Sequence, residues 1–263
     1  MPREKNSDAG TLYLVGLGPG SSDLLAPGAV AALEDADVVV GFRGYMEQIT
    51  SLTAGKEIVS MELGQELERA ARAVDLAYCG SSVAVVSSGD AGVYGMAGPV
   101  FRVLTNRAWN GETPSVITIP GISALQSAAS LLGSPLMQDF CAISLSNLLT
   151  PWDRIEQRLE AAARGDFVVA LYNPRSRRRD WQLLEARRIL LEHRAGDTPV
   201  GLVREAYREE QRVVLTDLAS LEAGAGEVDM FTTVLIGNST SYVLNGKMVT
   251  PRGYEEKQGG VAD

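Results

Sequence analysis

The sequence predicts an α/β fold of two α/β domains with mixed sheets, and three observations lead to this prediction. Apolar runs typical of buried strands alternate with segments of helical spacing along most of the chain. The length of 263 residues suits one or two domains. Gly133-Ser134-Pro135 interrupts the alternation, so we expect domains over 11–135 and 136–254 with an active-site cleft between them.

The first half opens with a strand, a glycine-rich loop, a helix and a second strand. This order predicts a βαβ unit with parallel strands. Ser22 or Asp23 is expected to cap the helix, and Pro27 is tolerated in its first turn. The segments expected in this half are strands at 11–15, 37–40, 82–86 and 115–119, and helices at 24–33, 65–79, 97–106 and 122–132.

The second half carries fewer helices for its number of strands. The strands expected at 212–216 and 232–236 lack long helices around them, so parallel and antiparallel pairing should be mixed. Asn245-Gly246 predicts a closing hairpin between 242–244 and 247–249. The other expected segments are strands at 141–145, 167–172 and 200–204, and helices at 152–164 and 181–194.

The composition argues against two classes of partner. The chain carries 24 Lys and Arg against 33 Asp and Glu, whereas nucleic-acid-binding domains usually carry a basic surplus. Its longest apolar runs, 83–87 and 167–171, are far shorter than a membrane span. Residues 1–10 are polar and lack the apolar core of a secretory signal. We therefore expect a cytoplasmic protein that binds neither nucleic acid nor membrane.

Histidine and cysteine are almost absent from the chain. His193 is the single histidine, and Cys79 and Cys141 are the two cysteines. These residues make neither a disulfide framework nor a zinc site, and one histidine excludes most serine-triad and cysteine–histidine chemistry. We expect no bound metal, and any catalysis has to proceed without imidazole from this chain.

Three glycine-containing loops, 16–20, 89–95 and 120–121, follow predicted strands in the first half. Ligands of open α/β sheets bind at the carboxyl ends of strands, where glycine lets the backbone approach closely. The first half is therefore predicted to bind a small molecule. The carboxylate of Asp90 suits a ligand with an amine, a ribose or a positive charge; alternatively, Asp90 caps the following helix.

The first loop also matches part of a dinucleotide-binding fingerprint. Gly16 and Gly18 fit its opening, and an acidic residue follows about 20 positions later. The third glycine, however, falls at Ser21, and Pro19 removes a backbone donor. An NAD-binding oxidoreductase stays an alternative, whereas a P-loop is excluded because no Lys-Ser/Thr pair follows the glycines.

Three blocks of the first half resemble the signatures of the tetrapyrrole methylases, namely Gly16-Leu17-Gly18-Pro19-Gly20, Gly89-Asp90 and Pro120-Gly121-Ile122-Ser123-Ala124. This family comprises S-adenosylmethionine-dependent C-methyltransferases of cobalamin and sirohaem synthesis. Further blocks resemble the members that methylate carbon 17 of precorrin-3 or of its cobalt form; they lie at 139–140, 143–146, 148–152, 171–176, 233–239 and 250–254.

The resemblance implies two α/β domains, S-adenosylmethionine as the methyl donor, S-adenosylhomocysteine as a product, and a homodimer. It also implies methylation at carbon 17 with ring contraction to precorrin-4 or its cobalt form. Another corrinoid C-methyltransferase of the same fold and a non-catalytic corrinoid carrier are the alternatives. The residues at the family's cofactor positions are Pro19, Gly89, Asp90, Ala91, Tyr94, Ser123, Ala124, Tyr172, Asn173, Ala206 and Thr233.

A sulfonium methyl group is an activated electrophile, so such an enzyme has to align the reactants rather than supply a nucleophile. Ring contraction requires proton transfer, and the catalytic candidates that the resemblance implies are Asp90, Ser144, Ser146 and Tyr172. The family substrate carries acetate and propionate arms, which suit arginine forks. The expected substrate-binding residues are Arg175, Arg177, Arg178 and Arg204, with Arg179 in the same run; the alternative for this run is a solvated helix start.

The sequence departs from the family pattern at three places. Gln138 stands where many members have His, and Asn147 stands where Asp is common. Glu205-Ala206-Tyr207 replaces the usual Asn-Ala-Gly. These differences argue against proton transfer at those positions and leave the glycine loops unaffected.

Overall fold

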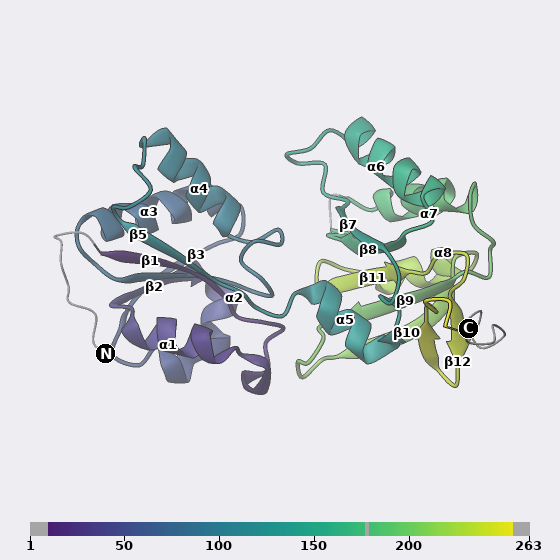
Figure 1. Cartoon of the computed structure of the whole chain (residues 1–263), viewed down its shortest axis with the longest axis horizontal. Helices are drawn as coiled ribbons and strands as arrows, with labels where there is room; N and C mark the ends of the chain where they lie inside the picture. The colour runs from purple at the N-terminus through teal and green to yellow at the C-terminus, as the bar shows by residue number, and fades with distance from the viewer. Residues whose placement is uncertain (1–9, 177–178, 255–263) are drawn as a thin grey trace, which may run out of the picture. The chain divides into compact units, whose positions relative to one another are not determined.

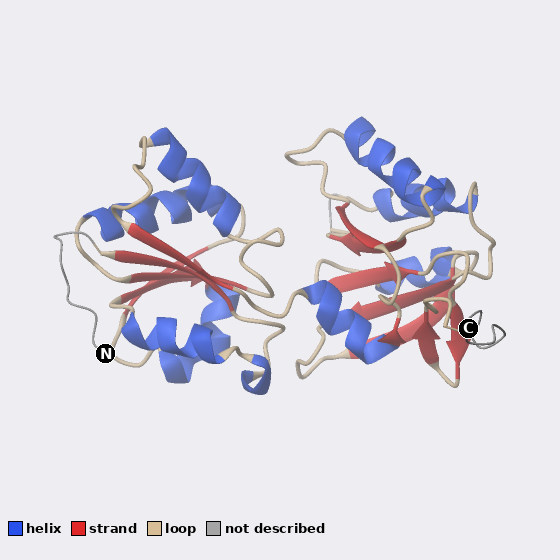
Figure 2. Ribbon diagram, viewed as in Figure 1, coloured by secondary structure: helices blue, strands red, loops and turns tan. Residues whose placement is uncertain are grey.

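The structure of the protein is a computed structural model that describes residues 10–176 and 179–254. The chain divides after Ala124 into two compact units, and each has a central sheet with helices beside it (Figures 1 and 2). The division falls before the break at 133–135 that the sequence suggests. The reason is helix α5 (Ala124–Leu132), whose apolar side chains belong to the core of the second unit.

The first unit contains a five-stranded sheet in the order β3-β2-β4-β1-β5, and all its strand pairs are parallel. This arrangement confirms the predicted βαβ organisation. The strands are β1 (Thr11–Gly16), β2 (Val38–Phe42), β3 (Glu57–Met61), β4 (Val83–Ser87) and β5 (Ser115–Ile119). The helices are α1 (Pro27–Asp35), α2 (Arg43–Met46), α3 (Glu66–Tyr78) and α4 (Ala97–Asn106), with 3-10 turns η1 (Ser22–Leu24) and η2 (Glu47–Leu52).

Helices cover both faces of this sheet, as Figure 2 shows. Leu14 and Val85 point to the face covered by α3 and α4, whereas Val15 and Val86 point to the face covered by α1 and η2. A parallel sheet buried on both sides requires continuous apolar strands. All five residues of β4 are accordingly buried.

One predicted cap is wrong. Helix α1 begins at Pro27 rather than at residue 24, and Ala26 precedes it in an extended conformation without a side-chain cap. Ser22 instead opens the 3-10 turn η1, which separates the first glycine loop from the helix. Proline suits the first helical position because its missing N–H would have no partner there.

The second unit contains a mixed five-stranded sheet in the order β10-β9-β11-β8-β7. Only β7 and β8 are parallel, so the expected mixture of pairings is confirmed. The strands are β7 (Phe140–Ser144), β8 (Val168–Tyr172), β9 (Pro199–Arg204), β10 (Arg212–Asp217) and β11 (Thr232–Ile236). The helices after α5 are α6 (Trp152–Arg164), α7 (Gln182–Leu191) and α8 (Leu221–Gly224), followed by the 3-10 turn η3 (Ala225–Glu227).

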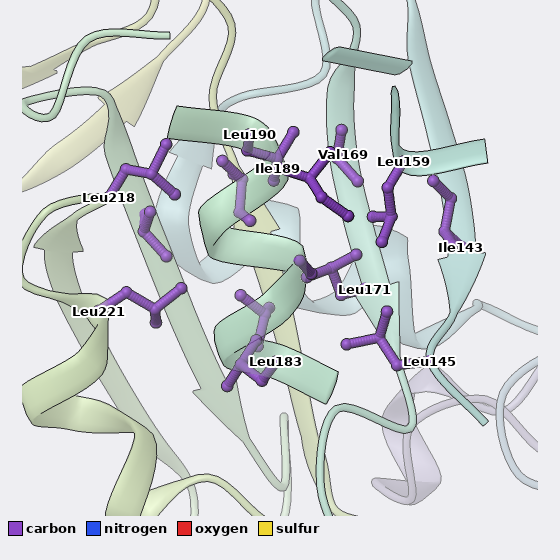
Figure 3. Packing of buried hydrophobic residues seen from close by; sticks show 14 of the residues in the cluster. Ile143, Leu145, Leu159, Val169, Leu171, Leu183, Ile189, Leu190, Leu218 and Leu221 are labelled. Carbon is purple, nitrogen blue, oxygen red and sulfur yellow. The ribbon is translucent and has the colours of Figure 1, made fainter. Parts of the chain in front are cut away.

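The core of the second unit lies on both faces of its sheet. Figure 3 shows Leu183 and Ile189 of α7 beside Val169 and Leu171 of β8. On the opposite face, α5 packs against residues such as Leu235 of β11. A helix on each face therefore fixes β8, whose carboxyl end carries several of the predicted site residues.

A small sheet completes the second unit. Strands β12 (Tyr242–Leu244) and β13 (Lys247–Val249) form the predicted hairpin, and β6 (Gly133–Ser134) pairs with β13. Asn245 and Gly246 both have positive φ, at 47° and 75°. Two left-handed central residues are what a type I′ turn requires, which is why Asn-Gly identified the hairpin from sequence.

Candidate active site

The three glycine-containing loops of the first unit lie together because they follow neighbouring strands, β4, β1 and β5. The N–H of Gly18 donates to the carbonyl of Gly89 at 3.0 Å, and the N–H of Gly89 donates back at 2.7 Å. The N–H of Leu17 also donates to the carbonyl of Ser87. These bonds fix the first loop against the second.

Glycine is required here for packing of one loop on another. A Cβ at Gly121 would lie 2.2 Å from the carbonyl oxygen of Gly89, and a Cβ at Gly16 would lie 2.6 Å from the nitrogen of Gly121. Real Cβ atoms essentially never approach so closely. The backbones of all three loops therefore meet at these glycines, and neighbouring backbone occupies the space that a side chain would need.

Asp90 joins the second loop to the third. Its Oδ1 accepts the N–H of Gly92 at 2.8 Å, and its Oδ2 accepts the N–H of Gly121 at 3.0 Å. The alternative role as a helix cap is wrong, because α4 begins at Ala97 after Met96. A carboxylate has about four acceptor sites, so both oxygens of Asp90 retain capacity for a ligand.

Large apolar side chains of the second loop and next to the third loop are exposed. Tyr94 is 55% exposed, and Val93 and Ile122 are also exposed. Tyr94 adopts a left-handed backbone with φ of 55°, which is uncommon for a bulky residue and favours a functional explanation. The second and third loops thus carry exposed apolar side chains as well as the carboxylate of Asp90. Of the other predicted positions in this unit, Pro19, Gly89, Ala91 and Ser123 are buried and Ala124 is half-buried.

A buried arginine that sequence reasoning missed supports the second loop. Arg69 of α3 is only 3% exposed. It donates to the carbonyl of Glu62 at 2.7 Å and to the sulfur of Met96 at 3.3 Å. Met96 also donates its N–H to the hydroxyl of Ser87. In the sequence, Arg69 cannot be distinguished from the solvated charges of an amphipathic helix.

The first glycine loop, 16–20, is not followed directly by the N-terminus of an α-helix. In a dinucleotide-binding βαβ unit, the helix follows the glycines at once and its N-terminus receives the pyrophosphate. Here the turn η1 intervenes and α1 begins only at Pro27. The NAD-binding alternative therefore loses its main structural support.

In the second unit, four predicted residues meet where β7 and β8 end. The side-chain nitrogen of Asn173 donates to the hydroxyl of Ser144 at 3.0 Å, and the N–H of Ser146 donates to the same oxygen at 3.2 Å. Asn173 has a φ of 51°, a conformation that asparagine tolerates better than most residues. Tyr172 precedes it and accepts the N–H of Leu125 on its phenolic oxygen at 2.9 Å.

Arg179 links two members of this group, Asn173 and Ser146. Its guanidinium donates to the carbonyl of Asn173 at 3.1 Å and to the hydroxyl of Ser146 at 3.3 Å. The side chain is 5% exposed, and burial lowers the pKa of Arg179 below its ordinary value. Sequence reasoning placed Arg179 in a basic run but gave no sign that it is the buried member.

The remaining predicted cofactor residues of this unit lie on neighbouring strands. Thr233 is buried in β11, opposite Val203 of β9. Ala206 follows β9 and packs, like Tyr172, against the cluster that includes Leu125 of α5. The second unit therefore brings its predicted residues to one edge of its sheet.

The backbone around Ala206 explains why the family pattern matters there. Glu205 and Tyr207 have φ values of 46° and 61°. Asparagine and glycine adopt this left-handed region with the least strain. The hydroxyl of Tyr207 lies 2.8 Å from that of Ser130, and its N–H donates to the side chain of Gln211.

The predicted substrate arginines differ in their surroundings. Arg175 donates to the carbonyl of Ala225 at 2.6 Å. Arg204 pairs with three carboxylates, and its hydrogen bond to Asp229 raises the pKa of Arg204 above its ordinary value. Arg177 and Arg178 lie outside the described residues.

Two departures from the family pattern have structural partners. Gln138 donates to the carbonyl of Pro251 at 2.6 Å and accepts from Asn238 at 3.1 Å, so it ties the closing hairpin to the start of β7. Asn147 accepts from Gln182 at 3.3 Å. Both side chains are engaged in structural contacts.

Residues 10–176 and 179–254 contain neither a candidate metal-binding cluster nor a candidate membrane-spanning helix. Within these ranges, no cluster of three or more His, Cys, Asp or Glu side chains is placed to hold a metal ion. Among the helices of the same ranges, none has the length and apolar character needed to cross a membrane.

Several relatives match the chain over nearly its whole length. A cobalt-factor III methyltransferase of Priestia megaterium is 50% identical over 249 residues, covering 94% of this chain and 46% of that protein. A probable cobalt-factor III C(17)-methyltransferase of Salmonella typhimurium is 44% identical over 243 residues, covering 92% and 99%. A precorrin-3B C(17)-methyltransferase of a Sinorhizobium species is 37% identical over 235 residues, covering 89% and 91%. The chain therefore spans less than half of the Priestia protein.

Solved structures of methyltransferases also resemble the structure of this chain. The methyltransferase CobJ superposes with a TM-score of 0.85 at 38% identity, covering 93% of this chain and 100% of CobJ. Uroporphyrin-III C-methyltransferase from Thermus thermophilus, solved with S-adenosylhomocysteine, gives 0.66 at 25% identity, covering 87% and 92%. Residues 11–222 also match the family described as Tetrapyrrole (Corrin/Porphyrin) Methylases. The chain therefore belongs to the tetrapyrrole methylase family.

Proposed function

We propose that the protein is an S-adenosylmethionine-dependent methyltransferase that methylates carbon 17 of a precorrin-3 macrocycle and contracts its ring in cobalamin biosynthesis. The observation that carries this proposal is the 44% identity to the Salmonella C(17)-methyltransferase, because the match extends over 99% of that relative. The ordered glycine loops and Asp90 support it independently.

The residues of the first unit fit the cofactor. Asp90 keeps acceptor capacity for a hydroxyl or amine of the ligand, and its charge attracts a cation. Tyr94, on the same loop, and Ile122, which follows Gly121, offer exposed apolar surface. When bound, S-adenosylmethionine supplies a methyl group on a positively charged sulfur. We propose that Tyr172, Asn173, Ala206 and Thr233 of the second unit also contribute to its binding.

The task of the protein is then to orient the reactants and exclude water. Correct orientation can lower a barrier by about 7–11 kcal/mol, without a nucleophile from the chain. The three interlocked loops suit this task because their backbones are held against each other by hydrogen bonds and close packing. A chain with one histidine can therefore still catalyse methyl transfer.

We propose the cobalt form of the macrocycle as the natural substrate. The relatives named for cobalt-factor III are 50% and 44% identical to the chain, compared with 37% for the relative named for precorrin-3B. Parallel assays with cobalt-loaded and metal-free macrocycle test this point. Faster methyl transfer to the cobalt form is expected, and transfer to the metal-free form alone would contradict it.

Arginines are the proposed partners of the acidic arms. Arg175, Arg177 and Arg178 follow β8, although the last two lie outside the described residues. Arg204 is a weaker candidate, because three carboxylates already surround its guanidinium. Reversing the charge at Arg177 and Arg178 should raise the dissociation constant of the macrocycle, and an unchanged constant would assign both to solvent.

Calorimetry separates the proposed function from the oxidoreductase alternative. The protein should bind S-adenosylhomocysteine and not NADH, since the loop lacks an adjacent helix N-terminus. The reverse pattern would exclude the methyltransferase. The family resemblance also leads us to propose a homodimer, which sedimentation equilibrium tests; a monomer at micromolar concentration would contradict it.

A further inference from the structure

Ser144 is distinguished from the other candidate residues by how its hydroxyl is used. Its oxygen accepts one hydrogen bond from the side chain of Asn173 and one from the N–H of Ser146. A serine hydroxyl has two acceptor lone pairs and one proton. Both lone pairs are occupied, so the hydroxyl can interact with a ligand only by donating its proton. Ser144 is half-buried, at the carboxyl end of β7.

The other three candidates have different roles. The two carboxylate oxygens of Asp90 accept backbone N–H groups of two loops. The phenol of Tyr172 accepts the N–H of Leu125 at the beginning of α5. The hydroxyl of Ser146 accepts one hydrogen bond from Arg179 and keeps a second acceptor site, so it could either donate to a ligand or accept from it. The hydrogen bonds from Asn173 and Ser146 thus constrain the hydroxyl of Ser144 to act as a donor.

The charge beside Ser144 indicates what it would bind. Arg179 is 5% exposed, and among residues 10–176 and 179–254 its guanidinium contacts a carbonyl, a hydroxyl and the sulfur of Met230, all neutral, and no carboxylate. Its guanidinium reaches the backbone of Asn173 and the hydroxyl of Ser146, the two residues that bond to Ser144. A buried cation without a counter-ion favours an anionic acceptor nearby.

We propose that the hydroxyl of Ser144 donates a hydrogen bond to a carboxylate oxygen of the bound ligand, and that Asn173 and Arg179 are positioning residues for it. This inference rests on the proposed function for the identity of the ligand. Two molecules carry such an oxygen, the amino-acid end of S-adenosylhomocysteine and an acidic arm of the macrocycle. The shared chemistry is a carboxylate acceptor.

The test compares Ser144→Thr with Ser144→Val in the full chain. The two side chains have nearly the same shape, but only threonine has a hydroxyl. Calorimetry measures the dissociation constant of S-adenosylhomocysteine, and an absorbance titration measures that of cobalt-factor III. Ser144→Val is expected to weaken one of the two by about tenfold relative to Ser144→Thr. Ser220→Ala, which changes an exposed serine of the same unit, serves as the control.

The ligand whose affinity falls identifies the source of the carboxylate. Equal affinities of Ser144→Thr and Ser144→Val for both ligands would overturn the inference. A wild-type protein that binds both ligands but transfers no methyl group would contradict the proposed function alone. If the wild-type protein binds neither ligand, both proposals fail.

A double-mutant cycle tests the role of Arg179. Arg179→Lys keeps the positive charge, but the lysine ammonium lacks the planar set of donors with which the guanidinium bonds to both Asn173 and Ser146. If Arg179 acts through Ser144, adding Arg179→Lys to Ser144→Val should cause no further loss of affinity. Additive losses of affinity would contradict a positioning role, because they would mean that Arg179 affects binding independently of Ser144.

Discussion

The carboxylate of Asp90 accepts the backbone N–H of Gly121, a residue 31 positions further along the chain. This bond joins the loop after β4 to the loop after β5, and the same carboxylate also holds Gly92 of its own loop. One acidic side chain thus combines a structural role with the charge proposed to attract the cofactor.

Asp90→Asn should weaken both roles. The amide keeps the size of the carboxylate, but its nitrogen would face a backbone N–H that has lost its acceptor. The free energy of unfolding should fall by about 1–3 kcal/mol, and the dissociation constant of S-adenosylhomocysteine should rise by about tenfold. Asp35→Asn, at an exposed aspartate that pairs with Tyr13, is the matched control. Unchanged affinity would restrict Asp90 to loop structure.

Gly121→Ala tests the packing of the loops. The new Cβ would lie 2.2 Å from the carbonyl oxygen of Gly89, which is rigid backbone. Overpacking of this kind costs about 1–3 kcal/mol, measurable by urea unfolding. Gly98→Ala is the control, because nothing lies within 4 Å of its Cβ. Equal stability of the two variants would contradict the close approach of the loops.

Arg194 is predicted to hold the second unit together. This buried side chain donates to the carbonyls of Ala162, Phe167 and Gly237. Arg194→Met would leave these acceptors without their donor, so the free energy of unfolding should fall by about 3 kcal/mol. Arg164→Met removes an exposed arginine and should have little effect. Similar losses in both variants would refute the role of Arg194.

Because the backbone of Tyr207 is left-handed, glycine should give a more stable protein than alanine at this position, which is the reverse of the usual order. With φ at 61°, Tyr207→Gly should be more stable than Tyr207→Ala by about 1 kcal/mol. At Tyr242, an exposed position of strand β12 without positive φ, alanine should be the more stable substitution. Thermal unfolding measures the stability of the four variants. If alanine gives the more stable variant at both positions, the predicted backbone strain at Tyr207 is contradicted.

The two cysteines should differ in reactivity with pH. Burial raises the pKa of the Cys141 thiol, although nearby Arg194 opposes this shift, whereas Cys79 is exposed. The thiolate is the reactive form, and a raised pKa reduces its population at a given pH. Iodoacetamide at pH 8 should therefore modify Cys79 first, and modification of Cys141 should accelerate as the pH rises above 9. Equal rates in the folded protein would contradict this, whereas equal rates in urea are expected.

Strongly patterned elements could be predicted from the sequence. Helices α4 and α6 and strands β5 and β11 begin and end where the sequence predicts. Strand β3 was missed because it is an edge strand whose residues are mostly exposed, so Glu57-Ile58-Val59 lacks a buried apolar run. A helix over 122–132 was predicted and α5 begins two residues later, at Ala124, but the sequence does not show which sheet this helix packs against.

The site was less predictable than the fold. Glycine loops and Asp90 carry local signals, because turn geometry depends on residues close in sequence. Arg69 and Arg179 carry none, since their burial results from contacts with residues far along the chain, such as Met96 and Met230. A charged residue in a helix or a basic run is usually solvated, and only the tertiary structure shows the exceptions.

Methyl transfer to carbon 17 is the reaction that the proposed function requires. The protein is incubated with cobalt-factor III and S-adenosylmethionine carrying a ¹³C-labelled methyl group, and the products are analysed by mass spectrometry and NMR. We expect one labelled methyl group on carbon 17 of a ring-contracted macrocycle, with one S-adenosylhomocysteine released for each methyl group transferred. Label that stays on S-adenosylmethionine, or that appears on another carbon, would contradict it.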